Sequence, residues 1–323
     1  MPTTAPPSLD VAEVAVWAGP ERAELAGDVV DRMAGAARPL AVGGPACEAV
    51  ADLGRRLGCP VEHDLRKLLN DRPVASVLVA EFDGIDPLIL GKRLPAGTRA
   101  LCLEPRAAGL HESPPGYETV ASAPRFLDAP GHHRAAEPLD ALPPPRLIRF
   151  SSLGRPTHGS LLARALDAWA AVLAYADLPE TVTASAHDPT GEPDPPIRRR
   201  RGWLAAHARL ADGGAVLVEA ADTAAHTRRQ LSVLTADAQL TVSDTGYKLR
   251  QNNGAVLDAG DDDRDAAGFA DLIADQWRRD LERPVSATRP EADAAALACV
   301  HAALLSARTG EPESPRQLLK MQG

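Results

Sequence analysis

Short apolar runs alternate with stretches of helical periodicity through the first hundred residues, and no other feature constrains the fold as much. Between the runs, apolar residues recur every three or four positions, as Leu25, Val29 and Met33 do. Continuous apolar runs of this length are typical of strands that helices bury on both faces. The βαβαβ order predicts a Rossmann-like, doubly wound parallel sheet with right-handed crossovers. The predicted strands are Val11–Trp17, Pro39–Val42, Val74–Ala80 and Arg99–Leu103.

The second half of the chain changes to an α+β pattern. A strand is expected at Arg146–Phe150 and a helix at Leu161–Tyr175, and short alternating runs follow from Trp203 onward. Asn252-Asn253-Gly254 is a strong hairpin signal. We therefore expect an α+β domain with a large open, mainly antiparallel sheet. The predicted division is a Rossmann-like domain at 1–125, a proline-rich connection at 126–145 and the α+β domain at 146–323.

Charge and composition exclude several classes of function. The 323 residues include 35 basic and 44 acidic ones, a net charge of −9 that repels phosphate backbones and argues against nucleic-acid binding. No run approaches the 18 consecutive apolar residues of a membrane span. The four cysteines never form a CxxC pair, which argues against a zinc site or disulfide framework. We expect a cytoplasmic protein without a metal.

The turn after the first strand lacks the fingerprint of a dinucleotide site. The three glycine positions of GxGxxG fall on Ala18, Pro20 and Ala23. Pro20 removes an N–H group that would face phosphate, and Glu21 adds a like charge. The second predicted strand ends at Gly43 rather than at the carboxylate that holds a ribose.

For three clusters of titratable residues, we prefer a structural role to a functional one. Arg198–Arg201 could bind phosphate or sulfate, but charge runs are more often solvated loops. His132-His133 has no nearby third ligand and is interpreted as a surface pair. Asp261–Asp263 lacks the spacing of a calcium loop and is interpreted as a solvated turn.

Several segments, in order and spacing, resemble the Gfo/Idh/MocA oxidoreductases, the family of glucose–fructose oxidoreductase and inositol dehydrogenase. The resemblance implies a Rossmann domain, an open-sheet α+β domain, NAD or NADP as cofactor, sugar or polyol substrates, and pairing of subunits through the open sheet. It covers nearly the whole chain. The segments are Arg55–Ala80, Leu101–Pro105, Gly159–Leu162 and Leu304–Gly310.

At the positions that the resemblance assigns to catalysis, the residues differ from those of the family. The family's lysine in Glu-Lys-Pro falls on Glu104, and the aspartate and histidine of the following helix fall on Ala163 and Asp167. The family's Thr-Pro falls on Glu81-Phe82, and the histidine after it falls on Asp86. Loss of one general acid or base already costs about 10² to 10⁴ in rate.

These departures lead to a main hypothesis and two alternatives. The main hypothesis is a binding or regulatory protein that has lost hydride transfer and needs no cofactor, a homodimer with a small-molecule or protein ligand in the interdomain cleft. One alternative is an NAD- or NADP-dependent sugar or polyol oxidoreductase with a non-standard catalytic set. In the other, Glu104, Asp167 and Asp86 form an acidic site, although solvated surface acids are the simpler interpretation.

Overall fold

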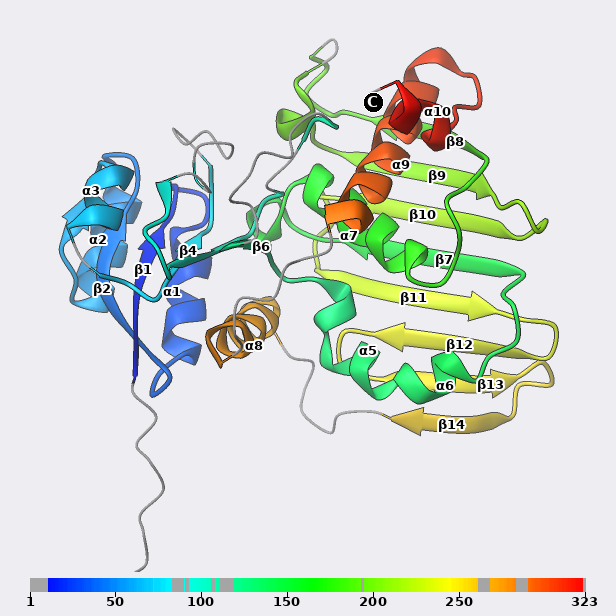
Figure 1. The fold of residues 1–323 in the computed structure, drawn as a ribbon, viewed down its shortest axis with the longest axis horizontal. Coiled ribbons are helices and arrows are strands. Elements are labelled where there is room, and N and C mark those ends of the chain that lie inside the picture. The colour runs from blue at the N-terminus through cyan, green and yellow to red at the C-terminus, as the bar shows by residue number, and fades with distance from the viewer. Residues whose placement is uncertain are drawn as a thin grey trace, which may run out of the picture.

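The first of two sheets is fully parallel. The computed structural model describes residues 11–71, 73–82, 90, 93–105, 108–110, 119–192, 195–260, 268–282 and 290–321. The strand order is β3-β2-β1-β4-β5-β6, and every neighbouring pair is parallel. This confirms the predicted doubly wound sheet (Figure 1). Its strands are β1 (Ala12–Trp17), β2 (Ala37–Gly43), β3 (Val61–Glu62), β4 (Ser76–Val79), β5 (Arg99–Cys102) and β6 (Val120–Ser122).

Among the described residues, helices α1, α2 and α3 connect strands of this first sheet, and local chemistry fixes where they end. The α3 helix begins where the Asp64 carboxylate accepts a hydrogen bond of 2.8 Å from the Arg66 N–H group. The α2 helix ends at Gly58, whose φ of +66° is the left-handed conformation of a helix stop. The helix predicted around residues 85–94 lies mostly outside the described residues. The helices are α1 (Ala23–Arg32), α2 (Glu48–Leu57) and α3 (Leu65–Asn70).

The second sheet has eight strands in the order β14-β13-β12-β11-β7-β10-β9-β8. All neighbours are antiparallel except β7 and β10, which confirms the predicted open, mainly antiparallel sheet. The predicted turn at residues 252–254 joins β13 to β14. The strands are β7 (Leu147–Leu153), β8 (Thr181–His187), β9 (Trp203–Arg209), β10 (Ala215–Ala221), β11 (Arg228–Leu234), β12 (Ala238–Ser243), β13 (Tyr247–Gln251) and β14 (Val256–Gly260).

The described helices of the second half, α8 (Phe269–Glu282) aside, lie over one face of the second sheet (Figure 1), and many strand residues of the other face are exposed or half-buried. Strand residues alternate between the two faces, so that Leu204 is buried while Trp203 is 41% exposed. The connection at 126–145, predicted to lack periodicity, contains short helices that pack beside this sheet. The remaining elements are η2 (Phe126–Asp128), α5 (Pro130–Arg134), α6 (Ala136–Asp140), η3 (Pro156–His158), α7 (Leu161–Leu173), η4 (Ile197–Arg199), α9 (Pro290–Thr309) and α10 (Pro315–Lys320).

A helix from late in the chain returns to the first sheet. The α8 helix (Phe269–Glu282) packs Ile273 and Trp277 into the same apolar core as α1. The Trp277 indole is fully buried and donates a hydrogen bond of 2.9 Å to the Ser76 hydroxyl at the start of β4. The predicted domain boundaries therefore stay a prediction, since residues 269–282 share a core with the first sheet.

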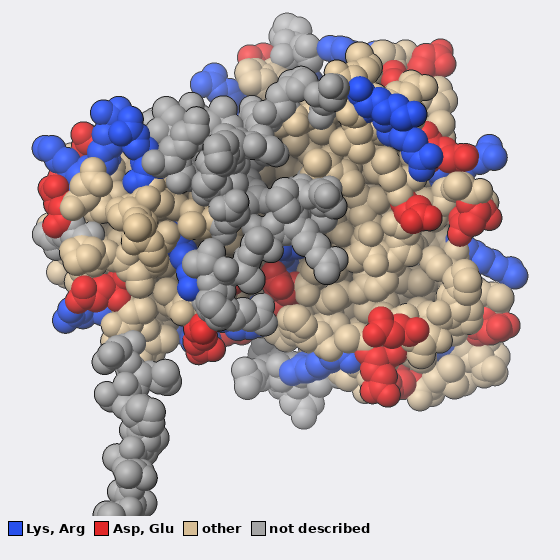
Figure 2. Space-filling model, in the orientation of Figure 1, with Lys and Arg blue, Asp and Glu red and all other residues tan. Residues whose placement is uncertain are grey.

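On the face drawn in Figure 2, basic and acidic side chains of the described residues form small interspersed groups rather than one basic strip. Within the described ranges, no helix is both long and apolar enough to cross a membrane.

Trp277→Ala should destabilise the protein by about 3–5 kcal/mol, because it empties a fully buried aromatic site and removes a hydrogen bond. Trp203→Ala is the matched control, and we expect it to cost less than about 1 kcal/mol because that side chain is half-exposed. Chemical denaturation of both variants measures the difference. Equal losses would show that α8 does not anchor the first sheet.

Candidate functional site

A buried ion pair lies at the carboxyl ends of the strands of the first sheet. Arg22 immediately precedes α1, and its guanidinium pairs with the Glu104 carboxylate just beyond β5. The second guanidinium nitrogen, Nη1, donates to the Ala80 carbonyl over 2.7 Å. The two side chains are only 7% and 14% exposed. Burial at this level makes each charge dependent on the other.

Ser160, from the second domain, completes this pair. Its backbone N–H group donates to Glu104 Oε1 over 3.0 Å, and its hydroxyl donates to Oε2. The same hydroxyl accepts a bond of 3.1 Å from the Ala163 N–H group and so caps α7. Glu104 therefore accepts hydrogen bonds from both domains, and we call Arg22, Glu104 and Ser160 the cleft triad.

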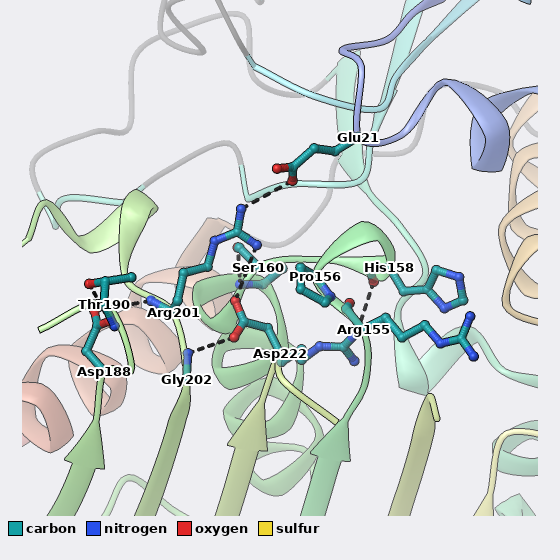
Figure 3. Close-up of polar contacts among 12 residues, drawn as sticks. Glu21, Arg155, Pro156, His158, Ser160, Asp188, Thr190, Arg201, Gly202 and Asp222 are labelled. Carbon is teal, nitrogen blue, oxygen red and sulfur yellow. Dashed lines mark hydrogen bonds and ion pairs between the residues drawn. The ribbon is translucent and has the colours of Figure 1, made fainter. Parts of the chain in front are cut away.

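A second contact between the domains comes from the arginine run (Figure 3). Arg201 Nη2 lies 3.3 Å from Glu21 Oε2 in the first domain, and Nη1 lies 3.8 Å from Asp222 Oδ2 at the end of β10. Asp222 is buried, which raises its pKa, and it accepts a bond of 2.7 Å from the Gly202 N–H group. Arg198 donates to the Pro105 carbonyl over 2.6 Å. The solvated-loop interpretation is wrong for Arg198 and Arg201.

Asp167 lies in a different cluster from Glu104. It is 2.9 Å from Arg229 and accepts a hydrogen bond of 2.8 Å from the Phe126 N–H group. Arg229 also pairs with Asp244 over 2.7 Å. Burial lowers the pKa of Arg229, but these two carboxylates together raise it above its usual value. Asp167 and Glu104 thus pair with different arginines. Asp86 lies outside the described residues, and the acidic-site alternative stays a prediction.

One further interpretation changes with the structure. His132 is half-buried, and its Nε2 hydrogen-bonds to the Tyr175 hydroxyl, so His132-His133 is not a simple surface pair. Burial and the neighbouring His133 lower the pKa of His132, and burial raises that of Tyr175 to about 12. Among the described residues, no group of three potential ligands could hold a metal ion.

The turn between β1 and α1 carries the positions that the resemblance assigns to the cofactor. Ala18 and Ala23 are buried there, and Pro20 is exposed. A Cβ atom on Gly19 would collide with the carboxylate of Glu81, which follows β4. At the end of β2, a Cβ on Gly43 would meet the Trp17 ring. The assignment of these positions to a cofactor stays a prediction.

Backbone N–H groups also lie at the start of α1. They belong to Ala23, Glu24 and Leu25. Such groups carry the positive end of the helix dipole and attract anions. The turn therefore offers backbone donors even though the glycine pattern is missing.

Three comparisons place the fold among known proteins. No family model and no curated protein matches the chain. Levoglucosan dehydrogenase in complex with NADH and L-sorbose has a TM-score of 0.70 at 15% identity, covering 94% of this chain and 98% of that one. GenD2 from gentamicin A biosynthesis, in complex with NAD, has a TM-score of 0.69 at 17% identity over 97% and 99%. This chain has the two-domain fold of these proteins.

A third structure with this fold also holds a nucleotide. It is an oxidoreductase from Agrobacterium radiobacter in complex with NAD+, L-tartaric acid and magnesium, with a TM-score of 0.71 at 15% identity over 95% and 99% of the two chains. The expectation of no cofactor is therefore wrong, because the fold points to a nucleotide. The missing glycine pattern could not decide this point. Glycines report only how closely the backbone can approach phosphate, whereas side chains distant in sequence can also bring charge to a phosphate site.

Several residues that build the site were absent from the sequence predictions. Arg22 and Arg229 were not singled out, and Ser160 entered only as part of a helix start. Arg22 carried one local signal, since it lies between a strand end and a helix start, where ligands bind in α/β sheets. Its partner Glu104 is 82 residues away along the chain, and no local pattern pairs them.

Arg229→Met should destabilise the fold by about 3–5 kcal/mol, because it leaves Asp167 and Asp244 buried without their cation. Arg228→Met is the control, since this neighbouring side chain is exposed and hydrogen-bonds to the uncharged Gln230; we expect a change within about 0.5 kcal/mol. Urea unfolding provides the comparison. A near-neutral Arg229→Met would show that the two carboxylates do not need the guanidinium.

Proposed function

We propose that the protein is an NAD- or NADP-dependent oxidoreductase that acts on a hydroxyl group of a sugar or polyol, with Glu104 as its proton acceptor. The cleft triad is the observation that carries this proposal. It lies at the carboxyl ends of parallel strands, where α/β sheets bind ligands, and both domains contribute to it. Structures of the same fold with NAD or NADH support the proposal.

The residues around α1 fit the phosphates of a dinucleotide through charge rather than through glycine. Glu21 would repel phosphate, but Arg201 lies against its carboxylate and neutralises it. The N–H groups of the first turn of α1 add the positive end of the helix dipole. The Glu81 carboxylate lies against Gly19, and a nucleotide there would displace this side chain, which is the flexible end of a long residue.

The cleft triad provides the proton chemistry that alcohol oxidation needs. A bound nicotinamide supplies the hydride acceptor. The substrate hydroxyl loses its proton to the Glu104 carboxylate, either directly or through the Ser160 hydroxyl that already donates to it. Arg22 places a permanent positive charge beside the oxygen that becomes negative as the proton leaves.

This arrangement differs from the one that the family resemblance implies. The resemblance places a lysine at position 104, and here that position is a carboxylate. The cation is nevertheless retained, because Arg22 reaches across from the first turn to the same place. The chain thus separates the two roles of a lysine, with the charge on Arg22 and the proton transfer on Glu104.

Pairing through the open face of the second sheet and a cytoplasmic location stay predictions. The open face carries Trp203 and Leu234, whose side chains are 41% and 37% exposed. Exposed apolar side chains of this size favour contact with another protein surface.

Glu104→Gln should lower the rate of NAD(P)-dependent oxidation by about 10² to 10⁴, because the amide cannot accept the proton. Affinity for NADH should persist, since the amide keeps the shape of the side chain. The assay follows nicotinamide absorbance across a panel of sugars and polyols, with a melting curve to verify folding. Glu24→Gln, an exposed acid on α1, is the control. An unchanged rate in Glu104→Gln would rule out this residue as the base.

Arg201→Ala should weaken NADH binding by about tenfold or more, because Glu21 is then left to repel the phosphates. Arg199→Ala is the matched control from the same segment, where the side chain is exposed. Glu21→Gln should have the opposite effect and tighten binding. Calorimetric titration with NADH measures all three, and equal affinities for Arg201→Ala and Arg199→Ala would contradict the assigned role.

A further inference from the structure

A short loop after β7 brings two basic side chains beside the cleft triad. The loop includes η3 and carries Arg155 and His158, the latter two residues before Ser160. We propose that this pair binds an anionic group of the substrate, a carboxylate or a phosphate, so that the substrate is an acidic or phosphorylated hydroxy compound. The inference rests on the proposed function and names the substrate class of that site.

The His158 ring is fixed with one nitrogen available. Its Nδ1 atom lies 2.7 Å from the Thr227 hydroxyl oxygen. Its ring stacks on Phe269 at the start of α8, with centroids 4.7 Å apart and planes 4° from parallel. Within the described ranges Nε2 has no hydrogen-bond partner. A ring held on one edge and one face presents that nitrogen to a ligand, and Nε2 donates when Nδ1 accepts from the Thr227 hydroxyl.

Arg155 is positioned by its Nε atom and keeps the rest of its guanidinium available. Nε donates to the Ala225 carbonyl over 2.7 Å. No carboxylate of the described chain forms an ion pair with Arg155. Its two terminal nitrogens form the planar fork that binds carboxylate or phosphate with two hydrogen bonds. The side chain is exposed, so a ligand can reach it.

The surroundings of His158 carry an excess of positive charge. Arg164 is buried and donates to the backbone carbonyls of Arg155 and His158 over 3.2 and 3.3 Å, and Arg22 Nη2 lies 3.5 Å from the Pro156 carbonyl. Burial and these three arginines all lower the pKa of His158. Burial and Arg229 likewise lower the pKa of Arg164 to about 10.

The nearby carboxylates do not neutralise the positive charge of the Arg155 guanidinium. Glu104 is engaged by Arg22 and Ser160. Asp222 acts on Arg164 and Arg201 but forms no ion pair with Arg155. An anion between Arg155 and His158 would therefore meet a site that lacks its counter-charge.

The position of the pair favours the substrate over the phosphates of a nucleotide. Arg201 lies against Glu21, and Figure 3 shows Arg155 and His158 on the other side of Pro156 from Arg201. Both residues belong to the loop that leads into Ser160, whose hydroxyl contacts the proposed base. A substrate anchored there would place a hydroxyl group near Glu104.

Direct binding of simple anions tests the site without any cofactor. The probes are inorganic phosphate and D-glucuronate, with D-glucose as the neutral control, followed through the His158 ring signals by NMR. We expect phosphate or glucuronate, but not glucose, to shift these signals and to raise the pKa of His158, since an anion stabilises the imidazolium. Which anion binds more tightly distinguishes a phosphorylated from a carboxylated substrate.

Arg155→Ala should weaken the binding of these anions by about tenfold or more. Arg250→Ala, an exposed arginine on β13, is the matched control and should bind as the natural chain does. The proposal is overturned if neither anion moves the His158 signals, or if Arg155→Ala binds them unchanged.

Oxidation assays separate this inference from the proposed function. With NAD+ or NADP+, the chain should turn over glucuronate or glucose 6-phosphate with a higher kcat/KM than glucose, and Arg155→Ala should remove that preference through KM. Preference for neutral sugars would overturn the inference and leave the oxidoreductase standing. Anion binding in a protein that binds neither NADH nor NADPH would overturn the oxidoreductase and, with it, the substrate role of the anion.

Discussion

The Arg22–Glu104 ion pair is the contact on which the geometry of the cleft depends. A buried charge without its partner is strongly destabilising, so each side chain fixes the other. Arg22 also bonds to a carbonyl of the first sheet, and Glu104 accepts from Ser160 at the start of α7. One ion pair thereby determines how a turn, a strand end and a helix of the second domain lie together.

The use of arginine rather than lysine at this point has a chemical consequence. A guanidinium does not lose its proton in a protein, so Arg22 can stabilise negative charge but cannot act as a base. Within the cleft triad, proton transfer must then involve Glu104 or Ser160. The proposed mechanism follows from this restriction, because a carboxylate that already accepts a hydroxyl hydrogen bond is the group in the triad that can take up a proton.

The sequence predicts the sheets well because their signals are local. The apolar run Val74–Ala80 contains β4, and the turn signal at residues 252–254 joins β13 to β14. It misses α5 and α6, because prolines obscure their short periodicity. It also does not predict that α8 packs on the first sheet, since that contact joins Trp277 to Ser76 across 201 residues.

The candidate site is harder to predict because its charge depends on ion pairs between residues that are far apart in the sequence. Taken singly, Glu21, Glu104 and Asp167 each count against an oxidoreductase because each adds a negative charge. Glu104 and Asp167 occupy positions that the resemblance assigns to catalysis, and Glu21 lies in the turn that would face the cofactor's phosphates. Folding places an arginine beside every one of them: Arg201, Arg22 and Arg229. What governs chemistry is the charge left after these pairs form. Arg201 and Glu21 are 180 residues apart, so only the folded chain reveals that the negative charges in the cleft are compensated.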